Sequence, residues 1–476
     1  SKGVEAYLVG GIVRDALLGR PTRDIDLAVA ADAVMLGRQL AVSLVGRFVP
    51  LDEKRGIVRV VVPSSEGAWF VDLSSLRDGL TGDLRGRDFT LDALAVSLTD
   101  AADGHPWSNV IDPLGGLPDL RSGLIRAVGP SVFRADPARL MRAPRLAAQL
   151  RFVISPETAA QIRRDAHLVA SVAPERIRDE LLMTIAEPQT ADWLRLLDQL
   201  GVLCQVIPEL EAARGVSQPK EHHWDVFGHL VETAGQVEIM LQDSSSHNGI
   251  VADSVPQFAS LEKHFAQEVS DGHSRLTLLK LAGLLHDVAK PATRTVDAAG
   301  RIRFLGHDKE GAEMVEKILR RLRLSGRGGE LARLMVEHHL RPSQMAQPGE
   351  LPTGRAIYRY YRDLGDASID TLYLNLADYL AARGPRLHQR EWSEYCHVVG
   401  HILQEGLERK APESLPKLIS GQDIMKVFSL NPGPRVGLLL GLVREAQASG
   451  ETKTRGEALE LVKANLDSGG GSAEIR

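Results

Sequence analysis

The stretch from Tyr7 to Val29, YLVGGIVRDALLGRPTRDIDLAV, decides the fold of the first part of the chain. Its apolar start predicts a strand, the pair Gly10-Gly11 predicts a tight turn, and the residues after it predict a short helix. A second strand then carries Asp24 and Asp26, whose side chains project from one face because directions alternate along a strand. Glycines between a strand and a helix let backbone N–H groups approach phosphate oxygens, and two converging carboxylates suit Mg²⁺. The stretch therefore predicts a phosphate-binding turn beside a metal-binding pair, as nucleotidyl transfer requires.

The same stretch resembles the signature of the class II nucleotidyltransferases, which include tRNA CCA-adding enzymes and bacterial poly(A) polymerases. Their pattern is G-G-x-V-R-D followed by D-x-D. The matching residues are Gly10, Gly11, Val13, Arg14, Asp15, Asp24 and Asp26. The resemblance implies that Asp24 and Asp26 are catalytic Mg²⁺ ligands, and that Gly10, Gly11 and Arg14 bind the nucleoside triphosphate.

Composition sets the limits for the rest of the chain. A length of 476 residues and 43% hydrophobic residues predict two or three globular domains. The longest apolar run, residues 436 to 443, is too short to span a membrane. Two cysteines exclude a disulfide framework and favour a reducing cytoplasm. A net charge of −5 means that any RNA contact must come from local groups of basic residues.

Residues 1 to 125 are predicted to form a small α/β head. Strands are predicted from Phe48 to Asp52, from Ile57 to Val62 and from Trp69 to Leu73, after a helix within residues 31 to 45. Asp72 lies on the last of these strands. It is either a third catalytic carboxylate or an ordinary aspartate at the end of a strand.

A second motif, GRDFTLDALAV, spans residues 86 to 96. Its Arg-Asp pair offers a guanidinium for phosphate, and a carboxylate that holds a ribose hydroxyl or orients that guanidinium. The motif resembles the family's R-R-D-F-T-x-N-A, which implies nucleotide binding by Arg87 and Asp88, although Gly86 and Asp92 depart from it. In CCA-adding relatives a longer loop precedes this motif and helps the switch to ATP. The short interval from 74 to 86 therefore favours addition of C residues from CTP.

Residues 126 to 215 are predicted to form a helical neck that selects the nucleotide. A helix is predicted from Phe133 to Phe152, in which Asp136 and Arg139 share one face and Pro144 introduces a kink. This pair forms either an intrahelical salt bridge or a reader of a base's Watson–Crick edge. The family's E-D-x-x-R motif, matched by Asp136 and Arg139, implies base selection. Of the remaining basic residues, Arg142 is predicted to bind the nucleotide. Four others are predicted to contact the tRNA acceptor stem: Arg145, Arg151, Arg163 and Arg164.

Histidines are concentrated in residues 216 to 405, in apolar helical settings where buried polar groups need partners. Their order resembles the HD phosphohydrolase superfamily, H…HD…D. The resemblance implies a metal site of His229, His286, Asp287 and Asp378, with His307 and His338 at the extra positions of two-metal members. A divalent transition metal such as Mn²⁺, Ni²⁺ or Co²⁺ is expected there. Either the site hydrolyses phosphoesters at RNA ends, with Lys290 as a phosphate partner, or the metal serves stability alone.

The sequence thus predicts an α/β nucleotidyltransferase head, a mostly all-α neck, an α-helical HD domain and a C-terminal helical segment from 406 to 476. The predicted activity is template-independent addition of C residues to the tRNA 3′ end from CTP, extending to full CCA if ATP is also used. The alternatives are an A-adding enzyme or poly(A) polymerase of the same family, and an HD metal phosphohydrolase that acts on RNA ends.

Overall fold

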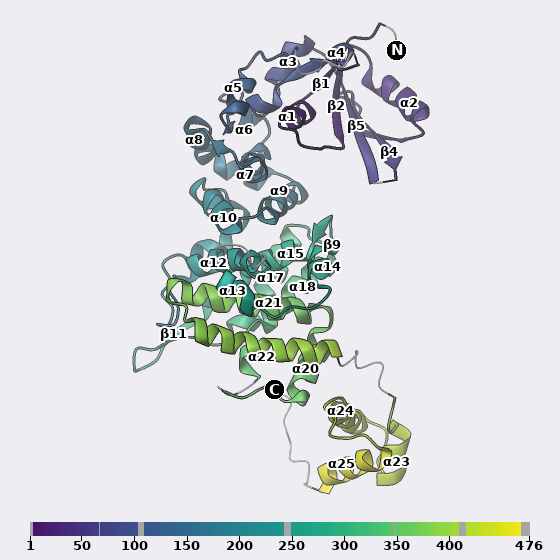
Figure 1. Cartoon of the computed structure of the whole chain (residues 1–476), viewed down its shortest axis with the longest axis vertical. Coiled ribbons are helices and arrows are strands. Elements are labelled where there is room, and N and C mark those ends of the chain that lie inside the picture. Colours follow the sequence, from purple (N-terminus) through teal and green to yellow (C-terminus); the bar gives the residue numbers. More distant parts are fainter. Residues whose placement is uncertain are drawn as a thin grey trace. The chain divides into compact units, whose positions relative to one another are not determined.

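The computed structural model of the chain describes residues 3–65, 67–102, 109–241, 249–345, 347, 349–408 and 416–467. It divides into two compact units (Figure 1). The first comprises Ser1–Glu187 and Asp192–Pro208, and the second comprises Pro188–Ala191 and Glu209–Arg476. Within the described ranges, no helix combines the length and the apolar character needed to cross a membrane.

A six-stranded sheet forms the centre of the head, in the order β3-β4-β5-β2-β1-β6. Only β2 and β5 are parallel neighbours; the other pairs are antiparallel. The three strands predicted between residues 48 and 73 are present. The elements of the head are β1 (Ala6–Val9), α1 (Gly11–Leu17), β2 (Asp24–Val29), α2 (Ala33–Ser43), β3 (Arg47–Asp52), β4 (Ile57–Ser64), β5 (Gly67–Ser75), α3 (Gly79–Arg85), β6 (Ala95–Ser97) and α4 (Leu98–Ala102).

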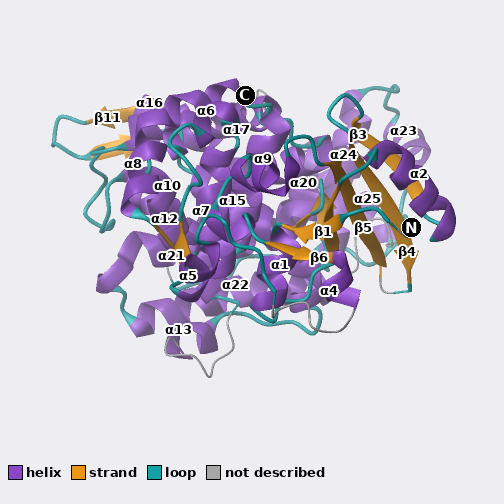
Figure 2. Ribbon diagram, turned by 90° about the horizontal axis from the view of Figure 1, so that it is seen from above, coloured by secondary structure: helices purple, strands orange, loops and turns teal. Residues whose placement is uncertain are grey.

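One face of this sheet packs against α2 (Figure 2). The helix begins at Asp32, whose side chain accepts hydrogen bonds from the backbone N–H groups of Val34 and Met35. Ala33 and Ala41 of the helix are buried in one cluster with Val58, Val60, Val71 and Leu73 of the strands. Side chains alternate between the two faces of a strand. Burial of these side chains against α2 therefore turns their neighbours along each strand to the opposite face of the sheet.

Strand register brings charged residues of three strands together. The parallel pairing of β2 with β5 places Asp26 opposite Asp72. The antiparallel pairing of β4 with β5 places Arg59 opposite Asp72 on its other side. Three charged side chains therefore lie in one row across neighbouring strands.

The neck helix predicted over residues 133–152 is interrupted. Its first turn is α6 (Val132–Ala135), and α7 (Arg139–Leu150) starts after three intervening residues and continues through Pro144. Asp136 lies between them in an extended conformation, with φ −144° and ψ 100°. The cause is Pro137, because a proline disfavours helical geometry in the residue before it. The prediction that Asp136 and Arg139 share one face of a continuous helix is therefore wrong.

The other elements of the first unit form the end of the head and the neck. They are α5 (Gly116–Arg121), β7 (Leu124–Ile125), β8 (Val153–Ile154), α8 (Pro156–Asp165), α9 (Pro174–Ala186), α10 (Thr190–Gln199) and α11 (Leu203–Val206). The interior of α7 is apolar and almost fully buried, and the helix packs against α9.

The second unit is helical, with α12, α15 and α21 packed against one another at its centre (Figure 1). The smaller cluster α23–α25 has its own apolar core. The elements of this unit are α12 (Val226–Ile239), α13 (Gly249–Ser254), α14 (Leu261–Ala266), β9 (Glu268–Ser270), β10 (His273–Ser274), α15 (Arg275–Leu285), α16 (Lys290–Thr293), β11 (Arg294–Val296), β12 (Ile302–Phe304), α17 (His307–Arg321), α18 (Gly326–His338), α19 (Arg341–Gln344), α20 (Gly354–Leu364), α21 (Ser368–Arg383), α22 (Gln389–Glu408), α23 (Gly421–Phe428), α24 (Pro434–Ala448) and α25 (Arg455–Asp467).

Candidate active site and metal centre

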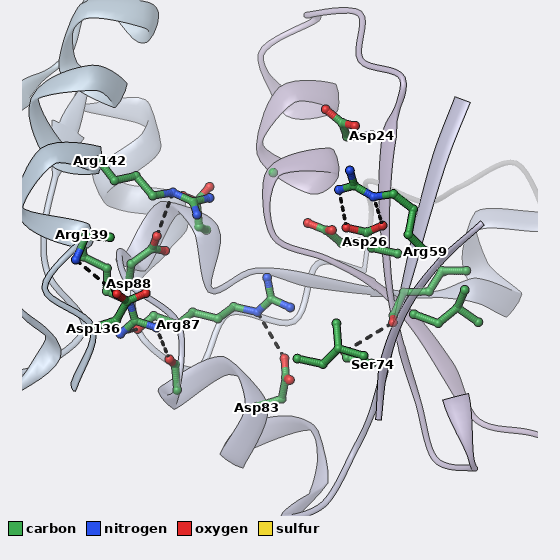
Figure 3. Close-up of a pocket in the computed structure, with 18 of the residues that line it drawn as sticks. Asp24, Asp26, Arg59, Ser74, Asp83, Arg87, Asp88, Asp136, Arg139 and Arg142 are labelled. Carbon is green, nitrogen blue, oxygen red and sulfur yellow. Dashed lines mark hydrogen bonds and ion pairs between the residues drawn. The ribbon is translucent and has the colours of Figure 1, made fainter. Parts of the chain in front are cut away.

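A cavity of about 630 Å³ lies between the head and the neck within the first unit. Figure 3 shows Asp24 and Asp26 of β2 on one side of it, Arg139 and Arg142 of α7 on the other, and Arg87 reaching between them. Predicted residues far apart in the sequence thus line one cavity. Its charged lining residues are Asp24, Asp26, Arg59, Asp72, Asp83, Arg87, Asp88, Asp92, Asp136, Arg139, Arg142, Arg176 and Glu180.

The two aspartates of β2 differ in exposure. Asp24 is exposed, whereas Asp26 is partly buried. Burial raises the pKa of Asp26; Arg87 opposes the rise and Asp72 adds to it. A partly buried carboxylate beside other acids gains most from a cation. Asp26, a partly buried acid that lines the cavity, is therefore the better placed of the two to bind a divalent metal ion.

Asp72 also lines the cavity, but its carboxylate already has a partner. The Arg59 guanidinium donates from Nε to Oδ1 at 2.7 Å and from Nη2 to Oδ2 at 2.8 Å. Such a bidentate pair neutralises the acid in a fixed orientation. The pair with Arg59 is a structural role for Asp72, and a role as third metal ligand remains a prediction.

Gly10 allows the Arg87 side chain to approach the carboxylates closely. A Cβ atom at Gly10 would lie 2.3 Å from Nη1 of Arg87 and 3.1 Å from Oδ2 of Asp26. The backbone of Gly10 has φ +75°, which other residues rarely adopt. The other end of the guanidinium, Nε, donates to Asp83 at 3.2 Å. The Gly-Gly turn therefore makes room for a cation beside Asp26, in addition to any contact with phosphate.

We expect Gly10→Ala to lower kcat/KM for nucleotide incorporation by about 100-fold, because the Arg87 guanidinium would be displaced by more than 1 Å. Gly19→Ala is the matched control, since Gly19 also has positive φ (+65°) but an added Cβ would meet no atom within 4 Å. Steady-state kinetics on both variants tests this. Equal losses in the two variants would mean that backbone strain alone is responsible.

Arg14, predicted to bind the triphosphate, does not line the cavity. It is 5% exposed. Its Nη1 donates to Asp92 at 2.6 Å, and its Nε and Nη2 donate to the two carboxylate oxygens of Asp15. The structure therefore gives Arg14 a supporting position, in which it joins α1 to the segment around Asp92.

The second motif is held by the neck. Asp88 pairs with Nε of Arg142 at 3.0 Å, not with its neighbour Arg87. Arg139 donates from Nη2 to the carbonyl oxygen of Gly86 at 2.8 Å and from Nη1 to that of Arg87 at 3.4 Å. Two arginines of α7 thus fix the main chain and the carboxylate of this motif at the edge of the cavity.

Asp136 has a partner that the sequence did not indicate. Arg176 of α9 donates to it from Nη1 at 3.2 Å and from Nη2 at 2.9 Å, and both residues line the cavity. Burial raises the pKa of Asp136, but the hydrogen bonds from Arg176 and from the Ala138 backbone outweigh it and lower the pKa overall. The proline at 137 could have signalled the break in the helix; no local pattern signals Arg176.

The arginines predicted to contact RNA divide into two groups. Arg151, Arg163 and Arg164 are exposed. Arg145 and Arg164 each donate to an acid at 2.5 Å, but the side chain of Arg145 is only 14% exposed, against 46% for Arg164. The prediction for Arg145 is therefore corrected to a structural contact between α7 and α9.

The second unit contains two groups of potential metal ligands that share Asp287. One is His229, His286, Asp287 and Asp378; the other is Asp287, His307 and His339. In each group the ligand atoms lie within 4.8 Å of one another. His338, predicted to be a ligand, is only partly buried and belongs to neither group, and the adjacent His339 takes its place with 1% exposure.

The orientation of the histidines fits a bound cation. Nδ1 of His286, His307 and His339 each contacts the carbonyl oxygen three residues earlier, at 2.9, 2.5 and 2.7 Å. Such contacts favour a proton on Nδ1 and turn Nε2 of each ring inward, where it can bind a metal ion. Nε2 of His307 and Oδ1 of Asp287 are buried without a hydrogen-bond partner, 3.1 Å apart. A histidine nitrogen and a carboxylate oxygen that face each other in a buried site are suited to a metal ion.

The charge balance at this site also favours a cation. Burial opposes a positive charge on His286, but Asp287 and Asp378 outweigh it and raise its pKa to about 10. A cavity of about 480 Å³ opens onto Asp287, His307, His339 and Asp378. Its other charged or titratable lining residues include Lys290, His222, Arg303 and Arg383, of which only Lys290 was predicted.

Three family matches cover most of the chain. Residues 6–78 match the poly A polymerase head domain, residues 151–214 match the probable RNA and SrmB-binding site of polymerase A, and residues 226–383 match the HD domain. The head and HD families both imply use of divalent metal ions.

Relatives match nearly the whole length of the chain. The chain is 35% identical to an A-adding tRNA nucleotidyltransferase from Deinococcus radiodurans, over 96% of this chain and 95% of the relative. It is 32% identical to CC-adding tRNA nucleotidyltransferases from Geobacter sulfurreducens (96% and 91% covered) and Thermus thermophilus (95% and 92%). Solved structures with the same fold include the Thermotoga maritima CCA-adding enzyme with tRNA (20% identity, TM-score 0.60, 97% and 92% covered) and a CCA-adding enzyme with CTP (20%, 0.63, 98% and 92%).

Proposed function

Because this chain belongs to the tRNA nucleotidyltransferase family, we propose that the cavity between head and neck adds cytidylate residues from CTP to the 3′ end of tRNA. The observation that carries the proposal is the meeting of Asp24, Asp26 and Arg87 in one cavity with the arginines of α7. Carboxylates for metal and guanidiniums for phosphate are the two groups that nucleotidyl transfer needs.

Each residue has a role in this proposal. The RNA 3′-hydroxyl attacks the α-phosphorus of the triphosphate, and pyrophosphate leaves. Asp24 and Asp26 would hold Mg²⁺, which when bound activates the hydroxyl and neutralises the leaving group. Arg87 and Arg142, with the backbone of Gly11, bind the phosphates, whereas the N–H of Gly10 already donates to the carbonyl oxygen of Leu94. The exposed Arg151, Arg163 and Arg164 contact the acceptor stem, where phosphate contacts position the RNA and do not read its sequence.

The interval between β5 and the second motif supports CTP as the nucleotide. It contains the short helix α3, whose Leu84 is fully buried and whose Asp83 holds Arg87. A packed interval of this kind differs from the longer loop that helps CCA-adding relatives to accept ATP. A-adding activity is the second candidate, because the Deinococcus radiodurans relative is 35% identical over nearly the whole chain.

The choice between these activities is tested by supplying one nucleotide at a time to tRNA ending at the discriminator base, at C, or at CC. We expect incorporation of CTP on the first two ends and little use of ATP on the third. Product length on a sequencing gel gives the result. Exclusive use of ATP on tRNA ending in CC would make the protein an A-adding enzyme.

A second function is proposed for the histidine-rich site: metal-dependent hydrolysis of phosphoesters at RNA ends. The observation in its favour is the pair of ligand groups that share Asp287 beside a cavity lined by Lys290 and Arg383. Histidine and carboxylate together favour a transition metal such as Mn²⁺, Ni²⁺ or Co²⁺ over Mg²⁺. Lys290 and Arg383 would bind the phosphate that is hydrolysed.

A further inference from the structure

Arg59 of β4 lies beside the acids proposed to hold Mg²⁺. The strand register places Asp26, Asp72 and Arg59 in one row, and residues paired across neighbouring strands project from the same face of a sheet. Val58 and Val60, the neighbours of Arg59 along β4, are buried against α2 on the opposite face. Arg59 therefore points toward the cavity, and its side chain is one of those that line it.

Two neighbours hold the Arg59 guanidinium. Its Nε and Nη2 donate to the two carboxylate oxygens of Asp72 at 2.7 and 2.8 Å, and its central carbon lies 5.2 Å from the centre of the Phe70 ring. Phe70 is paired in register with Asp24 across β5 and β2. A guanidinium over this ring therefore lies toward Asp24, and Figure 3 shows it close to both Asp24 and Asp26.

Asp24, Asp26 and Asp72 form an acidic cluster in the cavity, and all three act on Arg59. The hydrogen bonds to Asp72 raise the pKa of Arg59; partial burial lowers it, and the charges of the acidic cluster raise it further. A divalent cation attracted by the same acids meets the positive charge of Arg59. To take an oxygen of Asp72, the predicted third ligand, the cation must also replace a bidentate ion pair.

We propose that Arg59 is a resident counter-ion of the acidic cluster, which competes with divalent cations for Asp72 and keeps their binding weak until the nucleoside triphosphate arrives. This role rests on the function proposed for the cavity between head and neck. The triphosphate enters the same cavity, and its oxygens can accept the bidentate hydrogen bonds that Arg59 gives to Asp72. Arg59 then exchanges Asp72 for phosphate, and the freed carboxylate becomes available to the metal ion that accompanies the nucleotide.

The test measures Mn²⁺ binding to the full chain without nucleotide, from the electron paramagnetic resonance signal of free Mn²⁺. Because the histidine-rich site can also take Mn²⁺, Asp26→Asn identifies the share that binds in the head. We expect Arg59→Gln to lower the dissociation constant of the head site by about tenfold or more, since a positive charge near the cation is removed. Arg59→Lys keeps the charge, so its dissociation constant should lie between those of the wild type and Arg59→Gln.

The matched control is Arg55→Gln, which makes the same change of charge in the turn before β4. Arg55 pairs with the exposed Asp52 at 3.6 Å and does not line the cavity, so Mn²⁺ binding should stay as in the wild type. Mn²⁺ binding that is unchanged or weaker in Arg59→Gln contradicts the counter-ion role, and weaker binding would make Arg59 a positioning residue for Asp72.

The exchange has a readout of its own, the KM for CTP at saturating Mg²⁺. Arg59→Gln should raise this KM by about tenfold, because the triphosphate loses a charged hydrogen-bond donor. An unchanged KM would show that Arg59 does not move to the phosphates. A wild type that binds Mn²⁺ in the head but transfers no nucleotide contradicts the proposed function, and leaves the effect of Arg59 on metal binding as a separate result.

Discussion

Asp26→Asn is expected to abolish nucleotide transfer, lowering kcat/KM by about 1000-fold or more, which corresponds to ~4 kcal/mol of transition-state stabilisation. Asp26 is the more buried of the two β2 carboxylates, lines the cavity and lies beside Arg87 and Asp72. Asparagine has the same shape but carries no charge to hold a metal ion. Single-turnover incorporation of CTP into tRNA at saturating Mg²⁺ measures the loss.

The fold should tolerate this change. Burial raises the pKa of Asp26, so the charged form is disfavoured there, and a neutral side chain relieves that cost. We therefore expect the melting temperature of Asp26→Asn to be no lower than that of the wild type. Asp52→Asn, at the end of β3 and outside the cavity, is the control and should retain activity. Full activity in Asp26→Asn would rule out the proposed site.

The second large effect is expected in the other unit. Asp287→Asn should reduce metal binding and phosphoester hydrolysis by more than about 100-fold, since Asp287 belongs to both ligand groups. Metal content by mass spectrometry and hydrolysis of bis(p-nitrophenyl) phosphate measure the two losses. Nucleotide incorporation should persist, because the two sites lie in separate units. Loss of incorporation together with hydrolysis would show that the sites are not independent.

Asp287→Asn should also weaken folding. Asp287 lies 2.5 Å from Nζ of Lys290 and 3.2 Å from Nε2 of His286, and it is 1% exposed. Removing one partner of a buried ion pair typically costs about 3–5 kcal/mol. Glu316→Gln, on an exposed part of α17, controls for loss of an acid in the same unit.

Adjacent histidines offer a sharper comparison for the same site. His339→Ala should lose metal, whereas His338→Ala should keep it, because only His339 turns its Nε2 toward Asp287, at 3.6 Å. The two variants remove the same side chain at neighbouring positions. A matching loss in both would indicate disruption of α18 instead of loss of a ligand.

Local patterns were sufficient to predict much of the head. Alternation along β2 placed Asp24 and Asp26 on one face, and the glycine turn with the short helix followed as expected. Alternation and helical periodicity are properties of a few consecutive residues, so they can be read without knowing the fold. The family resemblance added the roles expected of these residues.

The predictions were wrong where the local sequence was compatible with two different structures. Nothing in the pair His338-His339 says which ring turns inward, because that depends on how α18 rotates against its neighbours. Asp136 and Arg139 had the spacing of a shared helix face, but Pro137 broke the helix between them. Here Pro137 indicated a break in the helix, whereas the spacing of Asp136 and Arg139 indicated a continuous helix.

By itself, then, the sequence determined the strand that carries the acidic pair, the glycine turn before α1 and most of the histidine site, but not whether His338 or His339 belongs to it. Only the tertiary structure decided the partners: Asp72 with Arg59 across two strands, Arg14 with Asp92, and Asp136 with Arg176. The reason is physical. Direction along a strand or helix is set by backbone geometry within a few residues, whereas an ion pair between distant residues depends on register and helix packing, which many side chains determine together.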